Sequence, residues 1–303
     1  MPLGPLLLMG ESEMSEYVIM TDSSCDLPAS LAEEMELTVL PLYVDVDGKK
    51  YTNYLDEREI SFARIYEMLR TKCPAKTSAV NMNDFTEPME RLLMAGKDVL
   101  YIGFSSGLSG TYSAGALAAQ ELSEKYPERK ILTVDSLCAS LGQGLLIWHA
   151  WQEKKKGKSI EEVRDFTEKT KLHLCHWFTI DDLMFLKRGG RVSGATAVVG
   201  SMLSIKPVMH VDNEGHLIKV STARGRKASI KALADEAGKR GIDLENQTIF
   251  ISHGDCVEEA NYLADIMRSR FNVKKVLVNY VGPVIGAHSG PGTIALFFLG
   301  TER

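Results

Sequence analysis

The chain has 303 residues, of which 45% are hydrophobic and 25% charged, an ordinary composition for globular proteins. At this length a single hydrophobic core is close to its size limit, so two packed domains are expected. The net charge of -5 leaves no basic excess to neutralise a phosphate backbone, which disfavours nucleic-acid binding.

The N-terminal segment, residues 1–16, reads as a flexible leader. Leu6, Leu7 and Leu8 form a short apolar run, but no Lys or Arg precedes it and no small-residue cleavage site follows. A signal peptide is therefore not expected, and no segment approaches the roughly 18 apolar residues of a membrane span. The five cysteines are scattered and form no Cys-x-x-Cys pair, which is typical of free thiols in a reducing compartment. We expect a cytoplasmic protein without stable membrane insertion.

In the first half of the chain, short β-branched runs alternate with helical patterns. Four runs predict strands, at residues 17–22, 38–46, 98–104 and 131–136. Alternation of this kind indicates βαβ units around a largely parallel sheet. We expect an N-terminal α/β domain over residues 17–172.

The pattern changes after the basic stretch at residues 153–159. Two alternating runs are joined at Asn213-Glu214-Gly215, a strong signal for a β-hairpin, and strands and helices alternate again beyond it. We expect a C-terminal α/β domain with a β-hairpin over residues 173–303.

His173, Cys175 and His176 lie close together and raise the question of a metal site. Alternation would place His173 and Cys175 on one face of a strand, but no second pair of ligands is evident. A packed strand is the favoured interpretation, and we expect neither a metal nor a cofactor.

The segment from Gly103 to Thr111 is a strand-to-helix turn rich in glycine and hydroxyl groups. Glycines let backbone N–H groups approach an anion, and a helix N-terminus favours negative charge. The hydroxyls available for such an anion are those of Ser105, Ser106, Ser109 and Thr111. Helix capping alone would explain much of the same pattern.

The same turn also fits the Gly-x-Ser-x-Gly motif, with Ser105 as the nucleophile. Asp135 follows the next strand and His288 comes late in the chain, which is the order found in α/β-hydrolases. Few strands precede the turn that would carry the nucleophile. The hydroxyl groups just after the motif, at Ser109 and Thr111, have no role in that mechanism. A serine hydrolase remains the main alternative from the motifs.

Three further segments carry candidate site residues. Four glycines and two prolines surround His288 between residues 282 and 292. This composition indicates a functional loop rather than a simple connection between two elements. Arg188 and Arg191 on a glycine turn, and Arg224 after the hairpin, suit either a phosphate or acidic partner or a solvated surface. No complete nucleotide-binding motif accompanies them, so any phosphate chemistry is expected from another chain.

Taken together, these segments resemble the DegV family, whose members include the fatty-acid-binding subunits of bacterial fatty acid kinase. The matching segments are TDSSCDLP (21–28), KTSAVN (76–81), SSGLSGTY (105–112), VDS (134–136), LKRGGRVSG (186–194), IKPVM (205–209) and GPVIGAHSGPG (282–292). They occur in the family's order, and the resemblance covers essentially the whole chain from Tyr17 to Arg303. One departure is Ala79-Val80, where the family often carries Gln-Pro, and it lies beside the ligand loop.

The resemblance implies two α/β domains with one long-chain fatty acid, of the palmitate or oleate class, buried between them. It assigns the carboxylate to Thr77 and Ser109, with Ser78, Ser106 and His288 beside them. It also implies a non-catalytic subunit that presents the carboxylate to a partner ATP-dependent kinase for acyl-phosphate formation. Arg188, Arg191 and Arg224 are then candidate contacts for the partner or its phosphate.

Two alternative functions stay open. One is the serine hydrolase with Ser105, Asp135 and His288. The other is a small-molecule kinase domain, since the family's fold is related to the substrate domain of dihydroxyacetone kinases.

Overall fold

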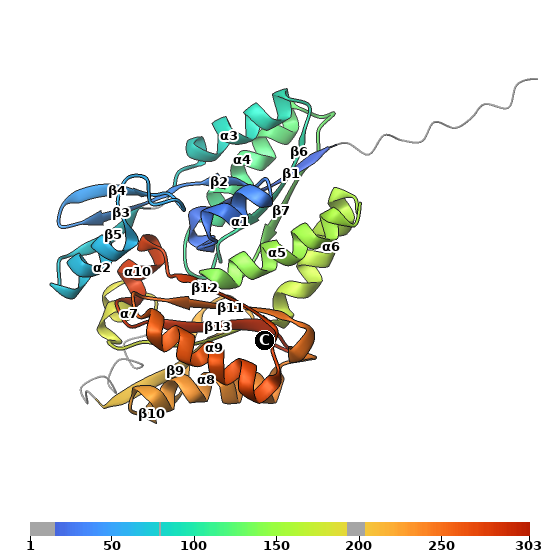
Figure 1. The fold of residues 1–303 in the computed structure, drawn as a ribbon. Coiled ribbons are helices and arrows are strands. Elements are labelled where there is room, and N and C mark those ends of the chain that lie inside the picture. The colour runs from blue at the N-terminus through green and yellow to red at the C-terminus, as the bar shows by residue number, and fades with distance from the viewer. Residues whose placement is uncertain (1–15, 79, 193–203) are drawn as a thin grey trace, which may run out of the picture.

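The computed structural model describes residues 16–78, 80–192 and 204–303, which form three β-sheets with helices packed around them (Figure 1). Apart from Glu16, the predicted leader lies outside the described residues, and so does Ala79 of the family departure. Within the described ranges, no helix has both the length and the apolar character needed to cross a bilayer.

A four-stranded parallel sheet, ordered β2-β1-β6-β7, forms the centre of the N-terminal half. Its strands are β1 (Tyr17–Asp22), β2 (Thr38–Leu40), β6 (Asp98–Gly103) and β7 (Ile131–Asp135). Every residue of β1 and β6 is buried, because helices cover both faces of the sheet. The helices of this half are α1 (Ala29–Glu34), α2 (Phe62–Arg70), α3 (Met82–Met94), α4 (Thr111–Lys125), α5 (Leu141–Lys155) and α6 (Ile160–Thr170). The predicted parallel sheet is confirmed.

A small antiparallel sheet, ordered β4-β3-β5, was not predicted. Its strands are β3 (Leu42–Val46), β4 (Lys49–Asn53) and β5 (Ala75–Ser78). The run at 38–46 therefore supplies two strands in two different sheets, and the break between them falls at Pro41. Proline has no N–H to donate to a ladder, so it ends the pairing of β2 with β1 at this point.

The C-terminal half contains a six-stranded mixed sheet, ordered β10-β9-β8-β13-β11-β12. Its strands are β8 (Leu174–Thr179), β9 (Ile205–Val211), β10 (Leu217–Arg224), β11 (Thr248–His253), β12 (Lys275–Tyr280) and β13 (Ile294–Leu299). The helices of this half are α7 (Met184–Arg188), α8 (Arg226–Arg240), α9 (Val257–Phe271) and α10 (Pro283–Ser289). Strands β9 and β10 form the predicted hairpin, and Gly215 adopts the left-handed conformation in its turn with φ 80°.

The two faces of the six-stranded sheet pack against different layers. Trp177 and Cys175 belong to the core formed with α8 and α9, whereas Phe178 belongs to a core shared with α5. Figure 1 shows α5 between the parallel sheet and the six-stranded sheet, with α8 and α9 on the far face. The core is thus continuous across the predicted boundary near residue 172, and the division into two domains there stays a prediction.

Arg303 ties the six-stranded sheet to the N-terminal half, and its removal is expected to destabilise the fold. Its buried guanidinium donates to the carbonyl oxygens of Leu137, Lys171, Leu174 and Asp212. Because Arg303→Ala removes all four of these buried, charge-assisted hydrogen bonds, we expect the free energy of unfolding to fall by about 2–4 kcal/mol.

Urea denaturation measures the effect of Arg303→Ala, and Arg268→Ala is the matched control. Arg268 pairs with Asp265 at the surface, where both side chains are exposed, so its loss should cost no more than about 1 kcal/mol. Equal effects of the two substitutions would contradict the anchoring role of Arg303.

Candidate functional site

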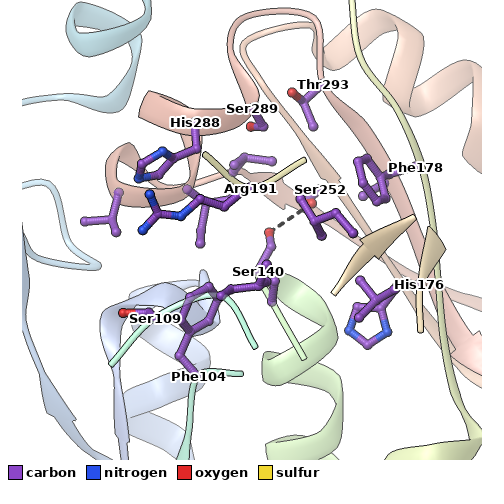
Figure 2. Close-up of a pocket in the computed structure, with 18 of the residues that line it drawn as sticks. Phe104, Ser109, Ser140, His176, Phe178, Arg191, Ser252, His288, Ser289 and Thr293 are labelled. Carbon is purple, nitrogen blue, oxygen red and sulfur yellow. Dashed lines mark hydrogen bonds between the residues drawn. The ribbon is translucent and has the colours of Figure 1, made fainter. Parts of the chain in front are cut away.

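A cavity lies between the six-stranded sheet and the loops at the carboxyl ends of β6 and β7 (Figure 2). The space that no atom fills is about 840 Å³, its open mouth included. Most of the lining side chains are apolar, and the polar ones are mainly hydroxyls and two histidines. Such an apolar hollow with a few polar groups is the usual form of a small-molecule site.

One face of the six-stranded sheet forms one wall of the cavity. Side chains alternate across a sheet, so His176 and Phe178 of β8 point to the cavity while their strand neighbours point to α8 and α9. In the antiparallel register His176 pairs with Phe297 and Phe178 pairs with Ala295, and both partners line the cavity. Ser252 of β11, opposite Ala295, completes this wall.

The other walls come from loops and helix starts of both halves of the chain. Phe104 and Leu108 lie in the loop between β6 and α4, Leu42 begins β3, and Val284 and Ile285 belong to α10. These side chains leave an apolar channel between the sheet and the loops. An alkyl chain is the chemical group that such a lining suits best.

Hydroxyl groups and two basic side chains gather at one end of the cavity. Thr77 Oγ1 lies 2.8 Å from His288 Nε2, and Ser109 Oγ lies 2.9 Å from Thr111 Oγ1. Arg191 also lines this part, next to His288 and Ser109 in Figure 2. The result is a polar end that offers hydrogen-bond donors and one permanent positive charge to an anion.

His288 is neutral at physiological pH. Burial, with a smaller contribution from Arg191, lowers the pKa of its imidazole to about 4. In the tautomer with the hydrogen on Nε2, His288 donates to Thr77 and leaves the Thr77 hydroxyl hydrogen free to point into the cavity. His288 then positions a donor rather than binding an anion through its own charge.

The lowered pKa of His288 predicts a loss of stability in acid. In the unfolded chain this imidazole takes up a proton near pH 6.5, but in the folded protein only near pH 4. Between these values the unfolded state binds more protons, so this group lowers the free energy of unfolding as pH falls, by about 1.4 kcal/mol per pH unit.

The substitution His288→Gln removes this contribution of His288. Chemical denaturation of both proteins at pH 7, 6 and 5 should show the stability difference between them shifting in favour of the variant as pH falls. A difference that stays constant with pH would contradict the assigned pKa.

Most of the site residues expected from the sequence line this cavity. Those that do are Thr77, Ser78, Ser109, Arg191 and His288. Ser106, Arg188 and Arg224 are exposed and are not among the lining residues. The guanidinium of Arg188 lies over the ring of Phe185. The structure thus groups one arginine, Arg191, with the hydroxyls and places the other two on the surface.

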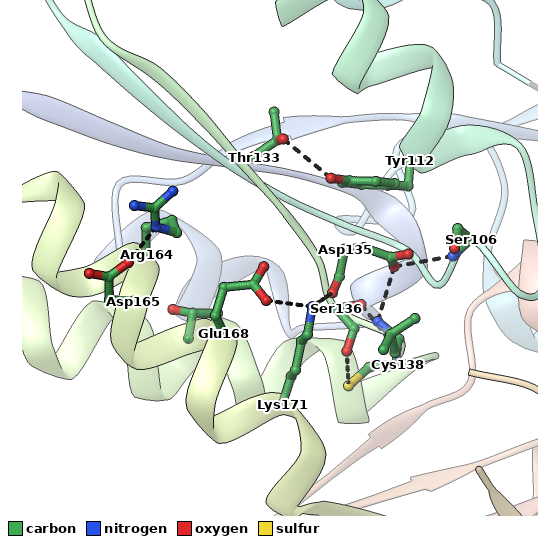
Figure 3. A network of polar contacts seen from close by, with 12 residues as sticks. Ser106, Tyr112, Thr133, Asp135, Ser136, Cys138, Arg164, Asp165, Glu168 and Lys171 are labelled. Carbon is green, nitrogen blue, oxygen red and sulfur yellow. Dashed lines mark hydrogen bonds and ion pairs between the residues drawn. The ribbon is translucent and has the colours of Figure 1, made fainter. Parts of the chain in front are cut away.

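The residues of the hydrolase alternative are not brought together. The buried Ser105 hydroxyl donates to the Gly215 carbonyl oxygen at 3.0 Å, and Asp135 accepts the backbone N–H of Ser106 at 3.2 Å (Figure 3). No hydrogen bond links any two of the described residues Ser105, Asp135 and His288. The Ser105 hydroxyl instead holds its loop against the turn of the β-hairpin through its bond to Gly215.

The segment Thr21-Asp22-Ser23-Ser24-Cys25-Asp26 forms a buried network behind the cavity. Asp22 caps the short 3₁₀ helix η1 (Ser23–Cys25) by accepting from Ser24 N, and its other oxygen accepts from Phe104 N at 3.0 Å. Asp26 accepts from Ser140 Oγ at 2.6 Å, and Ser140 in turn lines the cavity.

Several lining residues were not found from the sequence. The sequence presents His176 only as a metal candidate, and no motif marks Ser140, Ser252 or Ser289, which also line the cavity. Alternation in β8 shows that His176 and Phe178 share a face, but it does not say which face meets the cavity. The three serines lie on different elements, and only the packing of those elements brings them together.

Comparison with known proteins gives consistent results along the whole chain. The family model described as "Uncharacterised protein, DegV family COG1307" matches residues 16–301. A DegV domain-containing protein of Clostridium perfringens (strain 13 / Type A) is 46% identical over 290 residues, which cover 96% of this chain and 99% of that protein.

Two solved structures show the same fold. A DegV family protein from Thermus thermophilus, described by its fatty acid binding, is 31% identical with a TM-score of 0.81, and the match covers 94% of this chain and 99% of that one. DegV from Bacillus subtilis, described as a fatty acid binding protein, is 28% identical with a TM-score of 0.80, covering 95% of this chain and 100% of that one.

Proposed function

Since the chain belongs to the DegV family, we propose that it binds one long-chain fatty acid of the palmitate or oleate class. The tail occupies the apolar channel, and the carboxylate lies at the polar end beside Thr77, Ser109 and His288. The observation that carries this proposal is the cavity itself, a largely apolar hollow in which Thr77, Ser109 and His288 gather donor groups at one end. The fatty acid binding of the Thermus and Bacillus proteins, which share the fold and more than a quarter of the sequence, supports it.

The tail supplies most of the affinity. A palmitate-length chain buries about 14 methylenes at ~0.8 kcal/mol each, or about 11 kcal/mol before the costs of association. The hydroxyl groups then select and orient the acid end, because an unpaired carboxylate would not leave water for an apolar channel.

The donors at the polar end are mostly uncharged. Thr77 and Ser109 hold a carboxylate by hydrogen bonds, with Arg191 as the single cation among the lining residues. Hydrogen bonds of this kind leave lone pairs on the carboxylate available. We propose that one carboxylate oxygen attacks the γ-phosphorus of ATP held by a partner kinase, so that the bond to ADP breaks and an acyl phosphate forms.

In this proposal the chain itself is not the catalyst. Gly157-Lys158-Ser159 resembles the end of a phosphate-binding loop, but the glycine that such a loop needs five residues earlier is Gln152. The segment has a structural role instead, since Gly157 adopts φ 80° just beyond the end of α5 and Ser159 caps α6 by accepting from Glu162 N. The nucleotide would therefore come with the kinase catalytic subunit. We place this exchange in the cytoplasm, where the five free cysteines would stay reduced.

Native mass spectrometry of freshly purified protein tests the binding step. The expected result is a bound mass equal to one long-chain fatty acid, which organic extraction removes and added palmitate restores. Protein that emerges without ligand and takes up no long-chain acid would overturn the proposal.

The acyl-phosphate step and the hydrolase alternative are tested separately. The loaded protein, mixed with a fatty acid kinase catalytic subunit and ATP, should yield ADP and a hydroxylamine-reactive acyl group. A fluorophosphonate probe should leave Ser105 unlabelled, whereas labelling there would favour the hydrolase.

A further inference from the structure

A second group of hydroxyls lies in the cavity, away from the polar end. It consists of Ser140 before α5, Ser252 of β11, Ser289 at the end of α10 and Thr293 before β13. All four are at least nine-tenths buried. Figure 2 shows them between the group formed by Ser109, Arg191 and His288 on one side and His176 and Phe178 on the other. We call these four residues the hydroxyl wall.

The hydroxyl wall has hydrogen-bonding capacity that the protein does not use. Ser289 Oγ has no hydrogen-bond partner although its side chain is buried. Thr293 differs, because its hydroxyl donates to the Gly290 carbonyl oxygen at 2.8 Å. An unpaired hydroxyl facing an apolar alkyl chain would cost binding energy, so a ligand atom that pairs with it would be favoured.

Ser140 and Ser252 form a chain with the buried Asp26. Ser140 Oγ lies 2.6 Å from Asp26 Oδ2 and 3.1 Å from Ser252 Oγ. If Asp26 is ionised, the Ser140 hydroxyl donates to Asp26 and the Ser252 hydroxyl donates to Ser140. Ser252 then offers only lone pairs to the cavity. If Asp26 is protonated, its carboxyl hydrogen is donated to Ser140 and the Ser140 hydroxyl donates to Ser252. The Ser252 hydroxyl can then donate into the cavity. Burial raises the pKa of Asp26 to about 8, which favours the protonated form.

An alcohol suits every state of this wall, because it both donates and accepts. A second carboxylate would suit it poorly, since Asp26 stands directly behind Ser140 and no cation is among the four residues. A plain methylene would leave Ser289 unpaired.

We propose that the cavity selects fatty acids that carry a hydroxyl group near the middle of the chain, seated against Ser252 and Ser289. The inference depends on the proposed function, because the acid end must lie at Thr77 and Ser109 for the middle of the tail to reach the hydroxyl wall. It adds a chemical class of ligand, the mid-chain hydroxy acid, to a site described so far only as a fatty acid site.

The test compares the dissociation constants of stearate with those of stearates hydroxylated at carbon 2, 10, 12 or 18. In the wild-type protein we expect the 10- or 12-hydroxy acid to bind more tightly than stearate. The 18-hydroxy acid, whose hydroxyl lies at the far end of the tail, should bind about tenfold more weakly than stearate.

The double variant Ser252→Ala/Ser289→Ala should lose the preference. Its affinity for the mid-chain hydroxy acid should fall about tenfold relative to its affinity for stearate. Phe178→Leu, an apolar change in the same cavity, is the matched control and should alter both affinities by the same factor. The single variant Ser289→Ala serves if the double variant does not fold.

The outcomes separate the two proposals. If stearate binds but every hydroxylated acid binds about tenfold more weakly, or if the serine variants shift both ligands equally, the hydroxyl wall is not a recognition site and the fatty acid function stands. If neither stearate nor any hydroxylated acid binds, the proposed function fails and the inference fails with it.

Discussion

Replacing Thr77 by Val and Ser109 by Ala together is expected to weaken the binding of palmitate by about a hundredfold or more. Each residue lines the polar end of the cavity, and in the proposed function each offers a hydroxyl to the carboxylate. A hydrogen bond to a charged group contributes about 1.5–3 kcal/mol, and the two losses add because the variant leaves the buried acid without these donors. Displacement of a fluorescent fatty acid measures the change directly.

Ser106→Ala is the control that separates this geometry from the simple presence of hydroxyls in the turn. Its side chain is exposed and does not line the cavity, although the family resemblance placed it beside the ligand. The Ser106 contribution to the turn is its backbone N–H, which the substitution keeps. Equal losses for Ser106→Ala and for the double variant would contradict the placement of the carboxylate. Unaltered thermal unfolding of the double variant would show that the fold is intact.

Enlarging Ala295 to Phe is expected to abolish tight binding of long-chain acids while sparing short ones. Ala295 lies on β13 between Phe178 of β8 and Ser252 of β11, with its side chain at the cavity. A phenyl group there would occupy space that the tail needs. Excluding about four methylenes at ~0.8 kcal/mol each would weaken palmitate binding by about 200-fold. Isothermal titration with octanoate and palmitate compares the two lengths.

Leu296→Phe is the matched control for this substitution. Leu296 is the next residue on the same strand, and its side chain belongs to the core formed with α8 and α9. It therefore carries a similar packing penalty without entering the cavity. If Ala295→Phe bound palmitate as tightly as the wild type, the tail would not pass along this wall.

Elements whose signals lie in neighbouring residues could be predicted from the sequence. Alternating strands and helices predicted the parallel sheet of β2, β1, β6 and β7, and Asn213-Glu214-Gly215 predicted the hairpin of β9 and β10. These predictions succeed because strand periodicity and turn preferences depend on neighbouring residues alone. The small sheet of β3, β4 and β5 escaped prediction because β4 and β5 are short and carry mostly polar residues.

The site required the tertiary structure. Thr77 and His288 are separated by 211 positions yet lie 2.8 Å apart, because the edge of the small sheet meets the helix α10. The resemblance named both residues, but only the packing separated Ser109, which faces the cavity, from Ser106, which faces solvent. Ser140, Ser252 and Ser289 have no shared sequence signal at all. Side chains converge on a ligand through long-range pairing of strands and helices, and no local pattern of residues encodes that pairing.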